Sequence, residues 1–179
     1  WLDRHLDRLT SHAELIGLDP ILLPNAQTIA QAIASLCMEL GGNEAVIRLT
    51  VTRGSGPRGL LPPQDCHPTV LITAAPFAKA AKDEGLILAT SKRVRRNPWS
   101  IAGKVKSLNY LDNIAARQEV AACGAEEALV LSVDGSVAET TTANLFGIRD
   151  NTFYTAPANC GILAGLARKF VIDWCRDQA

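Results

Sequence analysis

The chain has 179 residues, and its 18 basic side chains are balanced by 18 acidic ones. This balance predicts no nucleic-acid partner, and no apolar run is long enough to cross a membrane, so no membrane partner is expected either. Apolar residues make up 47% of the chain, which is ample for a core. Five cysteines without a Cys-x-x-Cys pair, with three scattered histidines, predict no metal site and a reduced, cytoplasmic protein.

The first half of the chain is expected to form two helices followed by strands. Leu2, Leu6 and Leu9 recur at helical spacing, whereas residues 45–53 alternate with a period of two. This alternation places Arg48 on one face of a strand. The expected elements are helices at 1–18 and 26–40, strands at 45–53, 69–75 and 86–90, and a turn at 79–85.

Two basic segments separate these elements. Residues 53–63, R-G-S-G-P-R-G-L-L-P-P, form a loop, because glycine and proline end the strand before it. The segment lacks the G-x-x-x-x-G-K-[ST] order of a phosphate-binding loop. It is either a flexible surface loop or an active-site loop in which Arg53 or Arg58 meets a substrate carboxylate. Residues 93–100 are basic and turn-rich, and they are interpreted as an interdomain linker.

The second half is expected to form a helix, a hairpin and a final helix. Ser107 is expected to cap a helix at 108–123, and Gly124 to be its left-handed C-terminal residue. Asp134-Gly135 is a strong hairpin dipeptide, which places Glu139 on the returning strand. The expected elements are strands at 128–133 and 136–140, a strand opening at 144, a turn at 150–151, a strand at 153–155 and a helix from about 165.

Lys106 lies just before the expected helix. A lysine in this place is ordinarily a solvated charge. Lysine is, however, the side chain that forms a Schiff base with a carbonyl cofactor, and it must be partly desolvated for its neutral amine to attack. Apolar Val105 and Leu108 are compatible with that chemistry. Composition and periodicity alone indicate only a soluble α/β protein.

Two ordered motifs carry a resemblance to a known family. K-S-L-N-Y-L-D-N at 106–113, followed by D-G-x-V-x-E-x-x-x-x-N-L-F at 134–146, resembles the core signature of the class IV aminotransferases. These are pyridoxal phosphate (PLP) enzymes of fold type IV, and they include branched-chain and D-amino acid aminotransferases and 4-amino-4-deoxychorismate lyase. The spacing is the specific part, with the lysine 33 residues before the glutamate and the asparagine five residues after it.

The resemblance implies roles for four residues. Lys106 resembles the lysine that forms the aldimine with PLP and later moves the proton. Tyr110 matches the tyrosine whose hydroxyl bonds the phenolic oxygen of the cofactor. Glu139 matches the carboxylate that keeps the pyridine nitrogen protonated, which makes the ring a better electron acceptor. Asn144 resembles a group that supports the cofactor-binding residues from behind.

The resemblance also implies two contacts with the cofactor phosphate. Arg48, in the R-L-T-V strand, matches an arginine whose forked donors suit a phosphate. Leu166 and Ala167 lie in the tetrad G-L-A-R at 165–168, where the backbone amides at a helix N-terminus bind the phosphate. A threonine commonly precedes this arginine, so Ala167 loses a hydrogen bond worth about 1.5–3 kcal/mol.

The implied fold is α+β, a two-domain fold type IV enzyme resembling D-amino acid aminotransferase. The expected domains are a small one at 1–92, the linker at 93–100 and a larger one at 101–179 that carries the PLP lysine. Both ends of the family pattern are expected to be missing from this chain. A homodimer is expected by analogy with the family.

The expected function is PLP-dependent transfer of an amino group between a small amino acid and a keto acid through Lys106. The first alternative is a 4-amino-4-deoxychorismate lyase that releases pyruvate and 4-aminobenzoate, towards which the loop at 53–59 leans. The second alternative is an inactive fragment or cofactor-free relic, which the absent ends and Ala167 suggest. Ping-pong kinetics with a keto-acid acceptor would favour the transferase, and pyruvate formed without an acceptor would favour the lyase.

Overall fold

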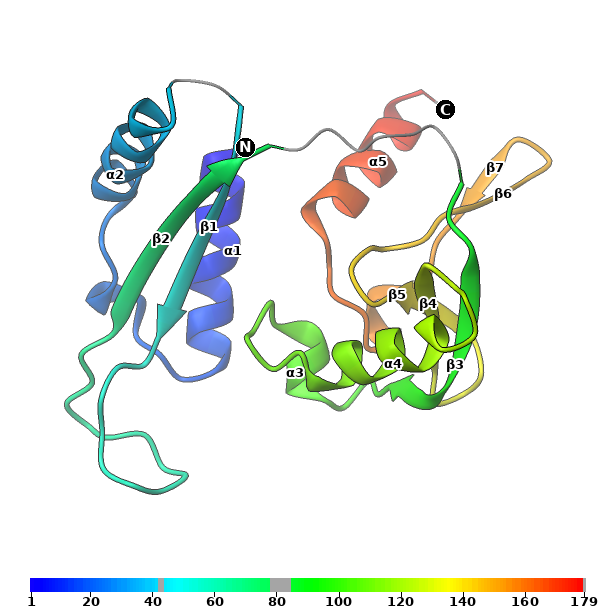
Figure 1. Cartoon of the computed structure of the whole chain (residues 1–179), viewed down its shortest axis with the longest axis horizontal. Helices are drawn as coiled ribbons and strands as arrows, with labels where there is room; N and C mark the ends of the chain where they lie inside the picture. Colours follow the sequence, from blue (N-terminus) through cyan, green and yellow to red (C-terminus); the bar gives the residue numbers. More distant parts are fainter. Residues whose placement is uncertain (42–43, 78–84, 179) are drawn as a thin grey trace. The chain divides into compact units, whose positions relative to one another are not determined.

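The computed structural model describes residues 1–41, 44–77 and 85–178. The chain forms two compact units that divide between residues 81 and 82 (Figure 1). Within the described ranges, no helix combines the length and the apolar character needed to cross a membrane. The turn expected at 79–85 lies, except for its last residue, outside the described residues.

The first unit contains two helices and a two-stranded antiparallel sheet. Asn25 caps the second helix, because its Oδ1 accepts the N–H of Thr28 at 2.9 Å. In the sheet, Arg48 pairs with Thr73. The elements are α1 (Leu2–Leu15), η1 (Pro20–Leu22), α2 (Ala26–Glu39), β1 (Ala45–Thr52) and β2 (Thr69–Pro76). These bounds lie within three residues of the expected ones.

The second unit is built on a mixed sheet of order β3-β4-β5. β3 and β4 are parallel, and β4 and β5 are antiparallel. The helix α4 covers one face of the sheet, and its Ala116 and Val120 pack with Val94, Ala128 and Val130 (Figure 1). The elements are β3 (Leu88–Arg96), α3 (Ile101–Lys104), α4 (Leu111–Ala121), β4 (Glu127–Ser132), β5 (Val137–Thr140), β6 (Gly147–Arg149), β7 (Thr152–Tyr154), η2 (Ala158–Cys160) and α5 (Leu166–Asp177).

Local turn chemistry forms the two hairpins as expected. Asp134 Oδ1 accepts the N–H of Ser136 at 2.9 Å, and Gly135 takes the left-handed φ of +87° that this turn requires. In the β6–β7 hairpin, Asp150 and Asn151 both have positive φ, which asparagine and aspartate tolerate better than most residues. The first hairpin returns the chain so that Glu139 lies on β5.

Three expected boundaries are wrong. The helix expected at 108–123 begins at Leu111, because Ser107 Oγ accepts the N–H of Asn109 at 3.3 Å and so stabilises a turn before the helix rather than capping it. Residues 93–96 of the expected linker are the end of β3, held there by buried Val94 and Arg96. The strand expected to open at 144 begins at Gly147, and Asn144 forms only an isolated bridge with Glu139.

Candidate active site

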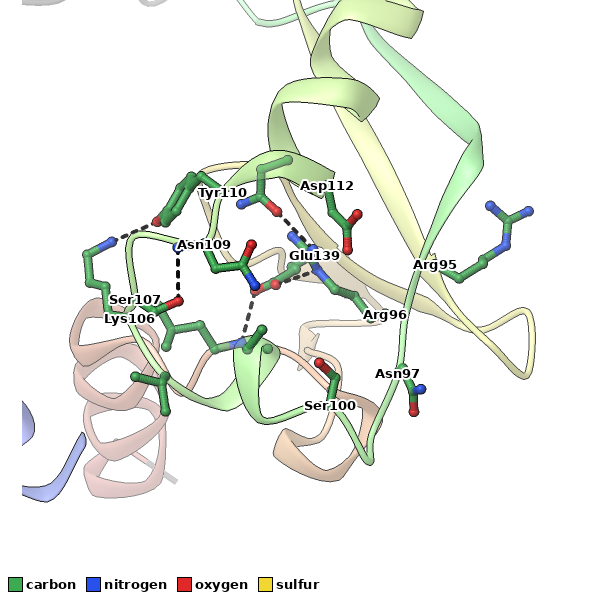
Figure 2. A pocket seen from close by; sticks show the side chains of 16 residues that line it. Arg95, Arg96, Asn97, Ser100, Lys106, Ser107, Asn109, Tyr110, Asp112 and Glu139 are labelled. Carbon is green, nitrogen blue, oxygen red and sulfur yellow. Dashed lines mark hydrogen bonds and ion pairs between the residues drawn. The ribbon is translucent and has the colours of Figure 1, made fainter. Parts of the chain in front are cut away.

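A pocket in the second unit brings three of the predicted residues together. Lys106, Tyr110 and Glu139 line it, although Glu139 is far from the other two in sequence. Its walls come from the end of β3, the segment between α3 and α4, the start of α4, β5 and the loop before α5 (Figure 2). The fold therefore joins the two motifs of the signature at one site.

Lys106 and Tyr110 contact each other across a tight turn. The Lys106 Nζ donates a hydrogen bond to the Tyr110 hydroxyl at 3.2 Å (Figure 2). The turn is held by the N–H of Ser107, which donates to the carbonyl of Val105 at 2.8 Å, and Val105 is buried. This anchors the backbone on both sides of the lysine.

The environment of Lys106 differs from the one expected. The lysine side chain is exposed, whereas the Schiff-base chemistry predicts partial desolvation. The reason is that only Val105 packs inward, while the side chain of Leu108 is 58% exposed and does not cover the amine. In the described second unit, the amine is thus oriented by Tyr110 rather than by burial.

Glu139 is buried at the inner wall of the pocket. Adjacent residues of a strand point to opposite faces, so Ala138 packs against Cys160 and Ile162 while Glu139 faces the pocket. Its Oε1 accepts from the Nε of Arg96 at 2.8 Å, and its Oε2 accepts from the N–H of Leu163 at 3.3 Å. The carboxylate is therefore fixed on both oxygens.

The pKa of Glu139 reflects opposing influences. Burial is the largest, and it raises the pKa above its ordinary value because removal from water penalises the charged form. The charge of Arg96, the hydrogen bonds from Leu163 and Arg96, and the charge of Lys106 all act in the opposite direction. The ionised carboxylate thus depends on its cationic neighbours.

Asn144 connects Glu139 to the loop before α5. Its Nδ2 lies 3.2 Å from Glu139 Oε2 and 2.9 Å from the carbonyl of Leu163. A Cβ added at Gly165 would overlap Asn144 Oδ1, so glycine is needed where the loop passes this side chain. The structure thus brings the predicted asparagine directly to the predicted glutamate.

The first turn of α5 carries the predicted phosphate residues. Leu166 and Ala167 follow the N-cap Gly165, in the part of a helix where backbone N–H groups lack helical acceptors. They do not line the Lys106 pocket themselves, but Leu163 of the same loop does. Arg168 donates to the carbonyl of Ala156 at 2.7 Å and so fastens α5 to the segment after β7.

The other predicted arginines lie in the first unit. Arg48 is exposed on β1. Arg53 donates to the carbonyls of Ile16 and Gly17 at 2.7 and 2.8 Å, which satisfies acceptors left open at the end of α1. A contact between Arg53 and a substrate carboxylate would compete with these bonds. Arg58 is exposed in the loop at 53–63.

Arg96 is the main site residue that sequence reasoning missed. The basic pattern assigns it to a solvated linker, but it is buried and ion-paired with Glu139. Buried Val94 two residues earlier gives a period-two signal that could have marked the face. The partner, however, lies 43 residues away in sequence.

The whole described chain matches one family. The family model of amino-transferase class IV matches residues 1–178. The chain belongs to the class IV aminotransferases. The α+β fold type IV architecture predicted from the signature is therefore confirmed by both the match and the similar solved structures.

Individual class IV relatives have more than one named activity. The aminodeoxychorismate lyase of Bacillus subtilis (strain 168) is 31% identical over 181 residues, which cover 98% of this chain and 60% of the relative. A branched-chain aminotransferase from Thermoproteus uzoniensis, solved with norvaline, is 31% identical with a TM-score of 0.86, covering 99% of this chain and 59% of that one.

A third similar structure contains a cofactor derivative. The branched-chain amino acid aminotransferase of T.th., complexed with N-(5'-phosphopyridoxyl)-L-glutamate, is 28% identical with a TM-score of 0.84, covering 99% of this chain and 57% of that one. The chain spans about three fifths of the length of the relatives it matches.

Proposed function

We propose that the chain acts as a PLP-dependent class IV aminotransferase, which moves an amino group between a small amino acid and a keto acid. The observation that carries this proposal is the convergence of an amine, a phenol hydroxyl and a buried carboxylate on one pocket. This donor set fits the aldehyde, the phenolic oxygen and the ring nitrogen of PLP. Glu139 Oε1 accepts from Arg96 and keeps capacity for a further donor.

Each residue has an assigned contact in the proposed complex. Lys106 bonds the aldehyde carbon, Tyr110 bonds the phenolic oxygen and Glu139 faces the ring nitrogen. When bound, PLP supplies an electron sink that stabilises negative charge at the α-carbon of the substrate. Phosphate contacts are assigned to Arg48 and to the backbone amides of Leu166 and Ala167.

The chain's own groups then carry out three tasks. Glu139 in its ionised form favours a protonated ring nitrogen. Lys106 accepts the α-proton of the substrate and delivers it again. Tyr110, whose hydroxyl lies 3.2 Å from the Lys106 Nζ, orients that amine. Asn144 keeps the Glu139 carboxylate in place through its 3.2 Å hydrogen bond.

A second candidate function is supported by one relative. The lyase of Bacillus subtilis is 31% identical to this chain, and the loop at 53–59 resembles that of some lyases. Lys106 and Glu139 serve both reactions, so these residues do not separate them. Arg53 and Arg58 are assigned to the substrate carboxylate in either case. A homodimer and a cytoplasmic location complete the proposal by analogy with the family.

One pair of assays tests the transferase against the lyase. Protein incubated with PLP is supplied with amino donors and a keto acid, and separately with aminodeoxychorismate alone. Amino transfer that Lys106→Ala abolishes supports the transferase. Stoichiometric pyruvate without an acceptor supports the lyase, and the absence of PLP uptake and of both reactions would favour a cofactor-free relic.

A further inference from the structure

Arg96 is a buried cation in contact with the most buried acid of the pocket. Its side chain is about as enclosed as that of Glu139, with 10% and 9% of each exposed. The guanidinium donates to Glu139 Oε1 at 2.8 Å and to Asn113 Oδ1 at 2.9 Å (Figure 2). A buried charge is tolerated where it is paired and hydrogen-bonded, so this geometry fixes both partners.

An irregularity in β3 selects Arg96 for this place. Thr90 pairs with Leu129, but Arg95 pairs with Leu131, so β3 contains extra residues between these two pairs. An odd number of extra residues reverses which side chains face each side of a sheet. Arg96 therefore shares the face of Ser132, with which it pairs, and Arg95 does not. Figure 2 shows the Arg95 side chain directed away from Glu139.

The irregular segment is held by a dedicated carboxylate of α4. Glu119 accepts hydrogen bonds from Ser91 Oγ at 2.7 Å, from the N–H of Lys92 at 3.0 Å and from the N–H of Arg93 at 3.3 Å. Ser91 is fully buried, and its Oγ also accepts the N–H of Val94 at 3.2 Å. These bonds satisfy the backbone groups that the bulge removes from the strand ladder.

The charged groups around Glu139 come from every neighbouring element. Arg96 belongs to β3, Lys106 to the segment before α4, and Asp112 of α4 lines the same pocket. The loop before α5 contributes the N–H of Leu163. Lys106 is exposed and bonded to Tyr110, so Arg96 is the buried cation in direct contact with the carboxylate.

We propose that Arg96 is a positioning residue that holds the Glu139 carboxylate ionised and directed into the pocket. It acts through Glu139 and not on the substrate. In the proposed function, on which this role rests, it prepares the carboxylate for the ring nitrogen of PLP. Asn113 anchors the far side of the guanidinium, since its Oδ1 accepts from Arg96 and its Nδ2 donates to the carbonyl of Thr141 at 2.7 Å.

The test follows the titration of Glu139 in the full chain without PLP. Carbon-13 NMR of labelled glutamate side chains measures its pKa, with Glu139→Gln identifying the signal. Arg96→Gln is expected to raise the pKa of Glu139 relative to the unsubstituted protein and to weaken PLP binding by about tenfold or more. Arg96→Lys keeps the charge and is expected to shift the titration less. Arg93→Gln removes an exposed charge from the same strand and serves as the control.

The outcomes separate this inference from the proposed function. A Glu139 titration that is unchanged in a folded Arg96→Gln protein overturns the inference, even if PLP binds normally. If Arg96→Gln does not fold, an Arg96→Lys titration identical to that of Arg93→Gln overturns it instead. Failure of the unsubstituted protein to take up PLP contradicts the proposed function, whereas the raised pKa in Arg96→Gln would still support the coupling.

Discussion

Asn144 fastens Glu139 to the loop that leads into α5, with its Nδ2 3.2 Å from Glu139 Oε2 and 2.9 Å from the Leu163 carbonyl. One amide thus holds the acid of the pocket and the loop that ends at the predicted phosphate site. The five-residue spacing between Glu139 and Asn144 has a physical basis in this contact. The chain turns between them and returns to form an isolated bridge.

Gly165→Ala is expected to disrupt this contact. The new Cβ would overlap Asn144 Oδ1, so the asparagine or the loop must shift. Overpacking of this kind costs about 1–3 kcal/mol, which denaturant unfolding would measure. Gly147→Ala is the matched control, because nothing lies within 4 Å of its added Cβ. Equal stability of the two variants would contradict the close approach.

Tyr110→Phe is expected to slow amino transfer by about tenfold to a hundredfold. It removes the hydroxyl that accepts from Lys106 at 3.2 Å, and a hydrogen bond to a charged group is worth about 1.5–3 kcal/mol. Steady-state kinetics of the PLP-loaded protein would measure the loss. Tyr154→Phe, at an exposed position on β7, controls for loss of a phenol hydroxyl. Equal rates in both variants would remove Tyr110 from the proposed mechanism.

Glu127 is expected to make stability depend on acid pH. Burial raises its pKa, but hydrogen bonds from Thr141, Ala128 and Thr142 outweigh burial and lower the pKa below its ordinary value. Because the folded state favours the ionised form, this stabilisation is present above the unfolded pKa and is lost as pH falls through the folded one. Glu127 accepts from Thr141 Oγ1 at 2.5 Å and from Thr142 Oγ1 at 2.9 Å.

The measurement compares Glu127→Gln with the unsubstituted protein between neutral pH and about pH 3. The free energy of unfolding of the unsubstituted protein should fall more steeply on acidification than that of the variant. Glu126→Gln, an exposed neighbour, should retain the steep dependence. Parallel curves for Glu127→Gln and the unsubstituted protein would show that Glu127 does not contribute.

Local signals predict much of the second unit. The Asp134-Gly135 turn and its alternating strands place Glu139 on β5, and Asp150-Asn151 marks the second hairpin. The predicted start of α4 is too early, because a serine hydroxyl can stabilise a turn as well as a helix. These features depend on residues close together in sequence, where turn and capping chemistry can be read directly.

The position of Arg96 depends on distant parts of the chain. Its burial requires the bulge in β3, and that bulge is held by Glu119, whose partner Ser91 lies 28 residues away. A basic stretch such as 93–96 resembles a linker until this contact is known. The roles of Arg48 and Arg58 stay predictions, because both side chains are exposed.

The central claim is that Lys106 is the residue that bonds PLP. Protein incubated with PLP and desalted is examined by visible absorbance, then reduced with borohydride and mapped by peptide mass. A visible band and a pyridoxyl group on Lys106, both lost in Lys106→Ala and kept in Lys104→Ala, are the predicted result. No band, or a label on Lys104 or Lys92, would contradict the account.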